Sequence, residues 1–259
     1  MKAYDIVKEA RDIQRLSTTD LIEALCDYFI ECHGDRCGSD DAAVVGGVGM
    51  MNGQPITIIG TEKGKTVEEN VRCNFGSASP GGYRKAARLL KQAEKFQRPV
   101  LTLINTAGAH AAPESEEGGI GEAIAQNLLV MSDITVPTLA IILGEGGSGG
   151  AIALALADEV WMMERSVYSI LSPEGFASIL WKDAKRAPEA AELMKLTSKD
   201  LKALGVIDRI IPEVVADEEI ARSELLTNLA GAIQDKLAEL QAQPIKKRLE
   251  NRAQRFRQF

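Results

Sequence analysis

The stretch of this sequence best suited to bind a negative charge is Gly144 to Ala151, which reads Gly-Glu-Gly-Gly-Ser-Gly-Gly-Ala. It follows a strand-like apolar run, Pro137 to Leu143, and precedes the small apolar residues Ile152 to Ala157. This order predicts a strand, a glycine loop and the start of a helix. Glycines have no side chain to shield the backbone, so several N–H groups can converge on one anionic oxygen beside the positive end of the helix dipole. The sequence therefore predicts an anion site.

A dinucleotide site is the first chemistry compatible with this loop. Gly144, Gly146 and Gly149 match G-x-G-x-x-G, and Glu164 closes a later strand where an acid that binds ribose would lie. The intervening helix, however, has room for only about two or three turns. The motif also lies in mid-chain, whereas such motifs open a nucleotide domain.

A serine nucleophile is the second possibility, because residues 146–150 match G-x-S-x-G with Ser148 at the centre. The hydrolase order requires a histidine after the serine, whereas His33 and His110 both precede it. Only an unrelated order of triad residues would therefore be compatible with a serine hydrolase.

An oxyanion hole is the third possibility, since backbone N–H groups alone can stabilise an enolate or a carbonyl oxygen. A purely structural alternative is a close crossing of helix and strand that requires glycine.

Composition restricts the class of protein. With 259 residues, 45% of them hydrophobic and 26% charged, the chain can form one main α/β domain with appendages. The net charge of −7 argues against a general nucleic-acid-binding surface. Met1 to Arg11 lacks an apolar signal segment and no run approaches the roughly 20 apolar residues of a membrane span, so a cytoplasmic location is expected.

The four cysteines are too few for a disulfide framework, and free thiols are expected at Cys26, Cys32, Cys37 and Cys73. Their spacing around His33 is unlike that of structural zinc ligands, so no metal site is expected in this chain.

Hydrophobic periodicity predicts an α/β chain with a helical preface. The expected helices are Ala3 to Cys32 (interrupted at Ser17 to Asp20), Gly81 to Phe96, Gly119 to Met131, Phe176 to Trp181, Thr197 to Leu204 and Asp217 to Leu240. The expected strands are Val44 to Met51 and Pro55 to Ile59, which form a hairpin, then Val100 to Ile104, Thr138 to Leu143, Glu159 to Met163, Val167 to Leu171 and Val206 to Ile211.

Two successive units place small residues after a buried strand, Asn105 to Ala109 in the first and Gly144 to Ala151 in the second. Open α/β folds bind ligands at this edge of the sheet, so the two loops are expected side by side. The basic residues near the chain end are interpreted as a solvated helical face rather than a docking surface for acidic partners. They are Lys246, Lys247, Arg248, Arg252, Arg255 and Arg257.

Several longer strings carry a family resemblance between about His33 and Glu213. They are Gly34-Asp35-Arg36, Asn74-Phe75-Gly76, Gly82-Tyr83-Arg84-Lys85-Ala86, Gly144 to Ala151, and Ser172-Pro173-Glu174-Gly175 with Ala177 to Lys182. In order and spacing they resemble the carboxyltransferase alpha subunit of bacterial acetyl-CoA carboxylase, in a short form without an extended N-terminal segment.

The resemblance implies the crotonase (ClpP/crotonase) fold, a spiral of ββα units. It divides the chain into a helical N-terminal segment (1–33), a crotonase-like carboxyltransferase domain (34–213) and a C-terminal helical extension (214–259). It further implies an α2β2 heterotetramer with a beta subunit that holds the zinc and most of the CoA pocket. Biotin carboxylase and the biotin carboxyl carrier protein would complete an ATP-binding complex.

The reaction implied is transfer of a carboxyl group from carboxybiotin, presented by the carrier protein, to acetyl-CoA, giving malonyl-CoA for fatty acid biosynthesis. No cofactor would be bound covalently to this chain. Two oxyanion holes would be needed, one for the biotin ureido oxygen and one for the thioester oxygen. A general base is not required if biotin N1 takes the methyl proton.

By the same resemblance, the alpha chain supplies the biotin-side hole from backbone N–H groups. The candidates are Gly149, Gly150 or Ala151 together with Gly108 or Ala109. Substrate contacts are expected from Gly146, Gly147, Ser148, His110, Asn74 and Phe75.

The loop from 107 to 120 departs from the family pattern. Where the family reads Thr-Pro-Gly-Ala-Tyr-Pro-Gly, this chain has Thr-Ala-Gly-Ala-His-Ala-Ala from Thr106 to Ala112, and Glu116 to Ile120 lacks the family's arginine. Each lost proline is expected to weaken preorganisation by about 0.4–1 kcal/mol. His110 takes the tyrosine position and is expected to replace its packing rather than act as an acid or base.

Two alternatives follow. One is a non-catalytic paralogue that scaffolds or regulates the beta subunit. The other is a stand-alone crotonase-like acyl-CoA hydratase or decarboxylase.

Overall fold

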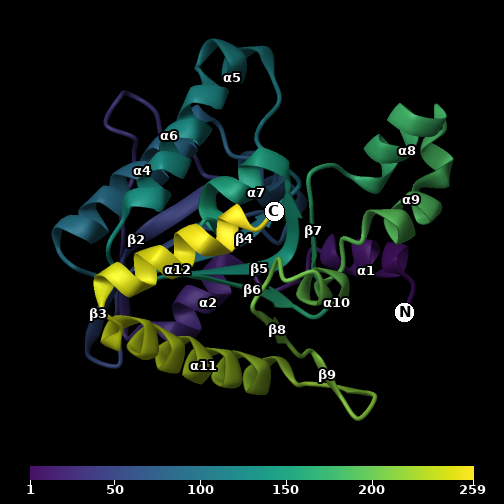
Figure 1. Ribbon diagram of the computed structural model, residues 1–259. Helices are drawn as coiled ribbons and strands as arrows, with labels where there is room; N and C mark the ends of the chain where they lie inside the picture. Colours follow the sequence, from purple (N-terminus) through teal and green to yellow (C-terminus); the bar gives the residue numbers. More distant parts are fainter.

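A twisted, mostly parallel sheet lies between two layers of helices in this computed structural model, which describes residues 1–259 (Figure 1). The main sheet has the strand order β1-β2-β3-β4-β5-β6-β8, and β7 pairs with β5. Pairs from β3 to β8 are parallel, while β1, β2 and β3 are antiparallel neighbours. The strands are β1 (Tyr28–Glu31), β2 (Val44–Met51), β3 (Gln54–Thr61), β4 (Val100–Thr106), β5 (Thr138–Gly147), β6 (Glu159–Met163), β7 (Val167–Ser169), β8 (Arg209–Ile211), β9 (Val214–Val215) and β10 (Glu218–Glu219).

Two helices precede the first strand, and one or more helices follow each of β3, β4, β5 and β7. They are α1 (Ala3–Ala10), α2 (Thr18–Leu25), α3 (Val67–Arg72), α4 (Pro80–Lys95), α5 (Pro113–Glu117), α6 (Ile120–Asp133), α7 (Ser148–Ala155), α8 (Pro173–Trp181), α9 (Ala187–Met194), α10 (Ser198–Ala203), α11 (Arg222–Ala242) and α12 (Ile245–Arg257), with two 3₁₀ turns, η1 (Asn74–Gly76) and η2 (Ala184–Arg186). None of them is both long and apolar enough to cross a membrane.

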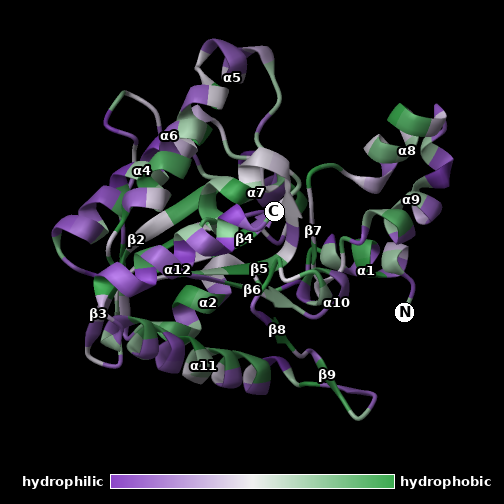
Figure 2. Ribbon diagram, viewed as in Figure 1, coloured by the Kyte–Doolittle hydropathy of each residue, from purple (hydrophilic) through white to green (hydrophobic).

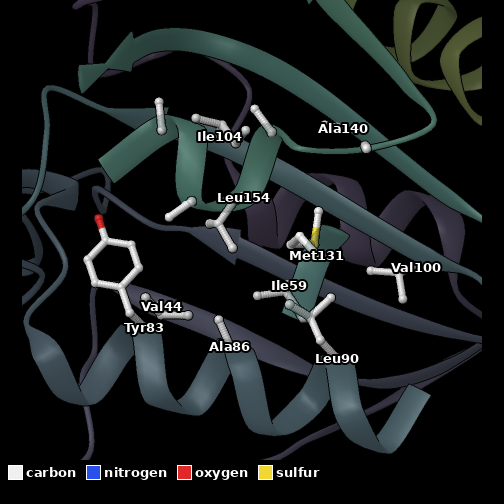
Figure 3. Packing of buried hydrophobic residues seen from close by; sticks show 14 of the residues in the cluster. Val44, Ile59, Tyr83, Ala86, Leu90, Val100, Ile104, Met131, Ala140 and Leu154 are labelled. Atoms are coloured by element: carbon white, nitrogen blue, oxygen red, sulfur yellow. The ribbon is translucent and has the colours of Figure 1, made fainter. Parts of the chain in front are cut away.

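Alternating side chains of the central strands build two separate cores, because successive residues of a strand point to opposite faces. On β5, Ala140 and Ile142 face one cluster with α4, α6 and α7, whereas Leu139 and Ile141 face another with α2 and α11. Figure 2 shows hydrophobic segments on the strands of the sheet, and Figure 3 shows the first cluster between α4 and the sheet. Both faces are covered, which explains the continuous apolar runs of β4 and β5.

The expected domain boundaries do not coincide with gaps in packing. Leu21 of α2 and Leu229 of α11 belong to the same hydrophobic cluster as Leu139 of β5. The three segments that meet at 33/34 and 213/214 therefore share one hydrophobic core. The division of the chain at these positions stays a prediction.

The predicted helix over residues 3–32 is wrong at its end. Helix α2 stops at Leu25, and Tyr28–Glu31 instead forms β1, which pairs antiparallel with β2. Similarly, the long C-terminal helix begins at Arg222 rather than Asp217, because Ala216 and Asp217 turn a small hairpin with φ of 52° and 67°. In both segments, pairing between strands determines the secondary structure, and hydrophobic periodicity does not reveal such pairing.

The basic chain end agrees only in part with its prediction as a solvated face. Lys246, Lys247 and Arg257 are exposed, as expected, but two of the arginines are not. Arg248 and Arg252 of α12 are each 3% exposed, and Arg252 Nε donates to Asp158 Oδ1 at 2.8 Å. Arg252 Nη1 also donates to the carbonyl oxygens of Met131 and Ile134, at 2.9 and 2.8 Å. These two buried arginines, Arg248 and Arg252, therefore hold α12 against the rest of the chain.

Candidate active site at the β5–α7 junction

The glycine-rich segment is a strand joined directly to a helix, and the predicted loop is wrong in its bounds. Strand β5 continues to Gly147 because both its edges are paired, Gly146 with Thr106 of β4 and with Tyr168 of β7. Helix α7 then begins at Ser148. The change of direction is concentrated at Ser148, whose φ of 52° lies in the left-handed region that non-glycine residues rarely adopt.

The first turn of α7 presents backbone donors at this junction. The opening N–H groups of an α-helix have no preceding turn to accept them, and they lie at the positive end of the helix dipole. Ser148 is exposed, Gly149 is half-buried, and Gly150 and Ala151 are buried. The small side chains leave this turn open to a neighbouring segment.

That neighbour is the segment after β4, and the expectation that the two small-residue segments lie side by side is confirmed. A side chain at Gly147 would collide with the carbonyl group of Ala107. A Cβ at Gly150 would lie 2.6 Å from the backbone nitrogen of Ala109 and 2.8 Å from the carbonyl carbon of Gly108. Glycine is therefore required at both positions by close backbone approach.

Hydrogen bonding distinguishes the N–H groups of the segment after β4. The Gly108 N–H donates to Thr106 Oγ1 at 3.1 Å, and the His110 N–H donates to the Ala78 carbonyl oxygen at 2.9 Å. The Ala109 N–H, between them, makes no hydrogen bond within the chain. Of the two sequence-predicted donors here, Ala109 is thus the one left free.

A pocket of about 450 Å³ opens in front of this segment. Asn74, Phe75 and His110 line it together with Gly108 and Ala109. Asn74 and Phe75 form a left-handed turn with φ of 45° and 53°, which leaves Phe75 59% exposed beside the pocket. Five of the predicted site residues, far apart in sequence, thus share one pocket.

Gly146 and Gly147 lie elsewhere. They border a smaller cavity of about 50 Å³ with Ala107, Glu145 and Pro173. Ser148 lies exposed at the turn between strand and helix, and its side chain makes no hydrogen bond with either histidine. The serine-hydrolase interpretation, which requires a histidine base next to Ser148, therefore finds none there.

Glu164, the acid of the dinucleotide interpretation, is engaged in the fold. Its carboxylate accepts the N–H of Glu213 at 3.1 Å and lies 3.4 Å from Lys199 Nζ. No group of three or more His, Cys, Asp or Glu side chains gathers in an arrangement that could hold a metal ion. All four cysteines are free thiols.

A partly buried network of ion pairs around Glu145 was not predicted from the sequence. Glu145, the second residue of the glycine motif, pairs with Arg11 Nε at 2.8 Å and with Lys63 Nζ at 2.7 Å. Burial raises its pKa, but Lys63 and Arg11 outweigh burial, so the pKa of Glu145 lies below its usual value. Glu145 also donates its N–H to Asn105 Oδ1 at 3.1 Å. The network joins the segments that follow α1 and β3 to the end of β5.

Arg11 extends the network to α8 through Glu174, at 2.8 and 3.1 Å. The hydrogen bonds from Arg11 lower the pKa of Glu174 to about 2. Since a depressed carboxylate pKa stabilises the fold above the unfolded pKa of about 4.3, this contribution is lost as pH falls from about 5 towards 2.

We therefore expect Arg11→Gln to have a lower free energy of unfolding than the native chain at pH 7. As the pH falls from about 5 to 2, the free energy of unfolding should decrease less for this variant than for the native chain. Denaturant unfolding at stepped pH measures this. Lys8→Gln, in the helix that Arg11 follows, is the control. Lys8 forms an exposed pair with Asp5 at 3.8 Å and lies 5.2 Å from the centre of the Tyr4 ring, but it pairs with neither Glu145 nor Glu174. Equal pH slopes for Arg11→Gln and the native chain would contradict the assignment.

His110 is fixed beside the pocket by two hydrogen bonds. Its Nδ1 lies 2.9 Å from the hydroxyl of buried Ser115, and its backbone N–H is bonded to Ala78. We expect His110→Gln to leave the pH dependence of kcat unchanged between about pH 5.5 and 7.5 for the carboxyl transfer that the sequence resemblance implies, because a side chain that exchanges no proton with the substrate adds no limb to the profile. A limb of the pH–rate profile that disappears in His110→Gln would identify it as an acid or base instead.

Comparison with solved structures identifies the fold class. The chain superposes on a transcarboxylase 12S with a TM-score of 0.70 at 20% identity, over 91% of this chain and 46% of that one. It superposes equally well, at 15% identity and 92% of both chains, on a chain of a Pseudomonas malonate decarboxylase hetero-tetramer in complex with coenzyme A. The fold is that of the crotonase-like carboxyltransferases, as the sequence resemblance implied.

Sequence comparison then identifies the family. The family described as "Acetyl co-enzyme A carboxylase carboxyltransferase-like" matches residues 1–259. The acetyl-coenzyme A carboxylase carboxyl transferase subunit alpha of Streptococcus pneumoniae is 54% identical over 259 residues, which cover the whole of both chains. The chain belongs to this carboxyltransferase alpha family.

Proposed function

We propose that this chain is the alpha subunit of an acetyl-CoA carboxylase carboxyltransferase and that it supplies the oxyanion hole on the biotin side. Full-length identity of 54% to a carboxyl transferase subunit alpha supports the activity. The observation that carries the site is the free N–H of Ala109 beside Gly150 in the first turn of α7. The partner would be a beta subunit, in an α2β2 assembly.

The chemistry of the junction fits this role. Carboxybiotin, which the carrier protein would present, would release its carboxyl group as CO₂ for transfer to acetyl-CoA. The electron pair of the broken N–C bond would stay on biotin and place negative charge on the ureido oxygen. The Ala109 N–H and the first N–H groups of α7 offer two independent sets of fixed donors for that charge. None of them requires a side chain to titrate, so we propose no general base in this chain. Phe75 offers an exposed apolar surface at the pocket.

The altered segment from 107 to 112 is held in a defined conformation without the family's prolines. Thr106 Oγ1 accepts the Gly108 N–H at 3.1 Å and donates to the Gly108 carbonyl oxygen at 2.8 Å, and the His110 N–H is bonded to Ala78. Each such bond contributes about 0.5–1.5 kcal/mol, comparable with the 0.4–1 kcal/mol assigned to a proline. This favours an active subunit over a non-catalytic paralogue.

A reconstitution separates the candidates. The chain is mixed with a purified beta subunit, and malonyl-CoA formation from acetyl-CoA and carboxylated carrier protein is measured. We expect turnover only when both chains are present. Binding of beta without turnover would indicate a scaffold, and turnover by this chain alone would indicate a stand-alone acyl-CoA enzyme. The cytoplasmic location stays a prediction.

A further inference from the structure

The hydroxyl of Tyr83 is buried and has no hydrogen-bond partner. Tyr83 lies on α4 and is 0% exposed, within the cluster that also contains Val44 and Ala86. Its oxygen is one of the few buried side-chain atoms of the chain without a partner. A buried unpaired hydroxyl lowers the free energy of unfolding by about 1–3 kcal/mol, so the presence of one at this position requires an explanation.

The position of this hydroxyl is informative. A Cβ at Gly150 would lie 2.7 Å from the Tyr83 oxygen and 2.6 Å from the nitrogen of Ala109. The hydroxyl and the free N–H therefore approach the same point, at the start of α7. Figure 3 shows the Tyr83 hydroxyl directed away from α4 towards one end of the helix that carries Leu154, which is α7.

The hydroxyl remains a donor at every working pH. Burial, reinforced by the negative charge of Asp41, raises the pKa of Tyr83 well above its usual range. Asp41 itself is occupied, because its carboxylate accepts the N–H groups of Ala43 and Ser79, at 2.8 and 2.6 Å. No acceptor of the chain therefore holds the Tyr83 proton in a fixed direction.

We infer that Tyr83 is a positioning residue for the oxyanion hole, an inference that rests on the proposed function. Its oxygen sets the spacing between α4, Gly150 and Ala109. Its O–H dipole can turn towards negative charge that develops in the hole without breaking an existing hydrogen bond, so this response has little reorganisation cost. The unpaired hydroxyl would thus make the free protein less stable, but it would stabilise the complex in which negative charge has developed in the oxyanion hole.

Tyr83→Phe tests this inference in the reconstituted complex with the beta subunit. We expect kcat for malonyl-CoA formation to fall about tenfold, less than the 10²–10³ typical of a donor in direct contact. KM for acetyl-CoA should stay the same, because the effect arises only as charge develops. The melting temperature should stay the same or rise, since an unpaired buried hydroxyl is removed.

Tyr168→Phe is the matched control. Tyr168 also packs on a glycine of the motif, but through its ring, with Cδ2 2.9 Å from a Cβ at Gly146. We expect its kcat and KM to remain those of the native chain.

An unchanged kcat in Tyr83→Phe, in a complex that is active with the native chain, would overturn the inference and leave the proposed function intact. A fall in kcat accompanied by a lower melting temperature would likewise overturn it, because packing would then explain the loss. An inactive native complex would overturn the proposed function and the inference together.

Discussion

Gly150→Ala is expected to lower kcat for carboxyl transfer by at least about 100-fold while the chain still folds. The added methyl group meets the backbone of Gly108 and Ala109 at 2.8 and 2.6 Å, and neither can move as a flexible side chain would. The Ala109 N–H must therefore shift away from the start of α7. Loss of one donor from an oxyanion hole typically costs 10²–10³ in kcat.

Stability should change much less than activity. Overpacking costs about 1–3 kcal/mol, which the better helix propensity of alanine offsets by up to about 1 kcal/mol. A β-branched residue such as valine would add further clashes, so alanine gives the cleaner test. The measurement is kcat of the reconstituted complex beside a denaturant unfolding curve of the variant.

Gly231→Ala is the control for the substitution itself. Gly231 is an exposed residue within α11, and a Cβ there would meet nothing within 4 Å. We expect a gain of about 0.5–1 kcal/mol in the free energy of unfolding and no change in kcat. Full activity in Gly150→Ala would refute the proposal that this junction is the oxyanion hole.

Asp158→Asn is expected to cost about 3–5 kcal/mol in the free energy of unfolding. The Asp158 and Arg252 side chains are both 2% exposed, with Arg252 Nη2 2.7 Å from Asp158 Oδ1. Arg248 Nε lies 3.5 Å from the other carboxylate oxygen, which also accepts the N–H of Thr138 at 2.8 Å. Without the carboxylate, two buried guanidinium groups lose their counter-charge.

Chemical denaturation measures this cost, and Glu250→Gln is the control. Glu250 is exposed on the same helix, α12, and forms only a 4.0 Å pair with Lys246. We expect the control to change the free energy of unfolding by no more than about 0.5 kcal/mol. A cost for Asp158→Asn as small as that of the control would show that the Asp158 carboxylate contributes little to holding α12 in place.

Regular apolar patterns predicted most of the central elements. The alternating residues of β2 and β3 around Asn52-Gly53, the apolar runs of β4 and β6, and the amphipathic face of α4 lie close to their expected positions. These patterns are local, because the side chains that form them are neighbours on one strand or helix. Segments whose state depends on a distant partner were predicted less well, such as β1, which exists by pairing with β2.

For the candidate site, too, the local features were predicted from the sequence and the contacts between distant segments were not. The sequence by itself determined that small residues lie at the ends of two successive strand segments and that neither histidine follows Ser148, and its longer motifs indicated the family. Only the tertiary structure decided that Ala109 rather than Gly108 has a free N–H, that Tyr83 reaches Gly150, and that the arginines of α12 are buried. The reason is physical: a pattern of residue types reflects local backbone preferences, whereas burial and hydrogen bonding depend on atoms contributed by distant segments, such as Ala78 to His110 and Asp158 to Arg252.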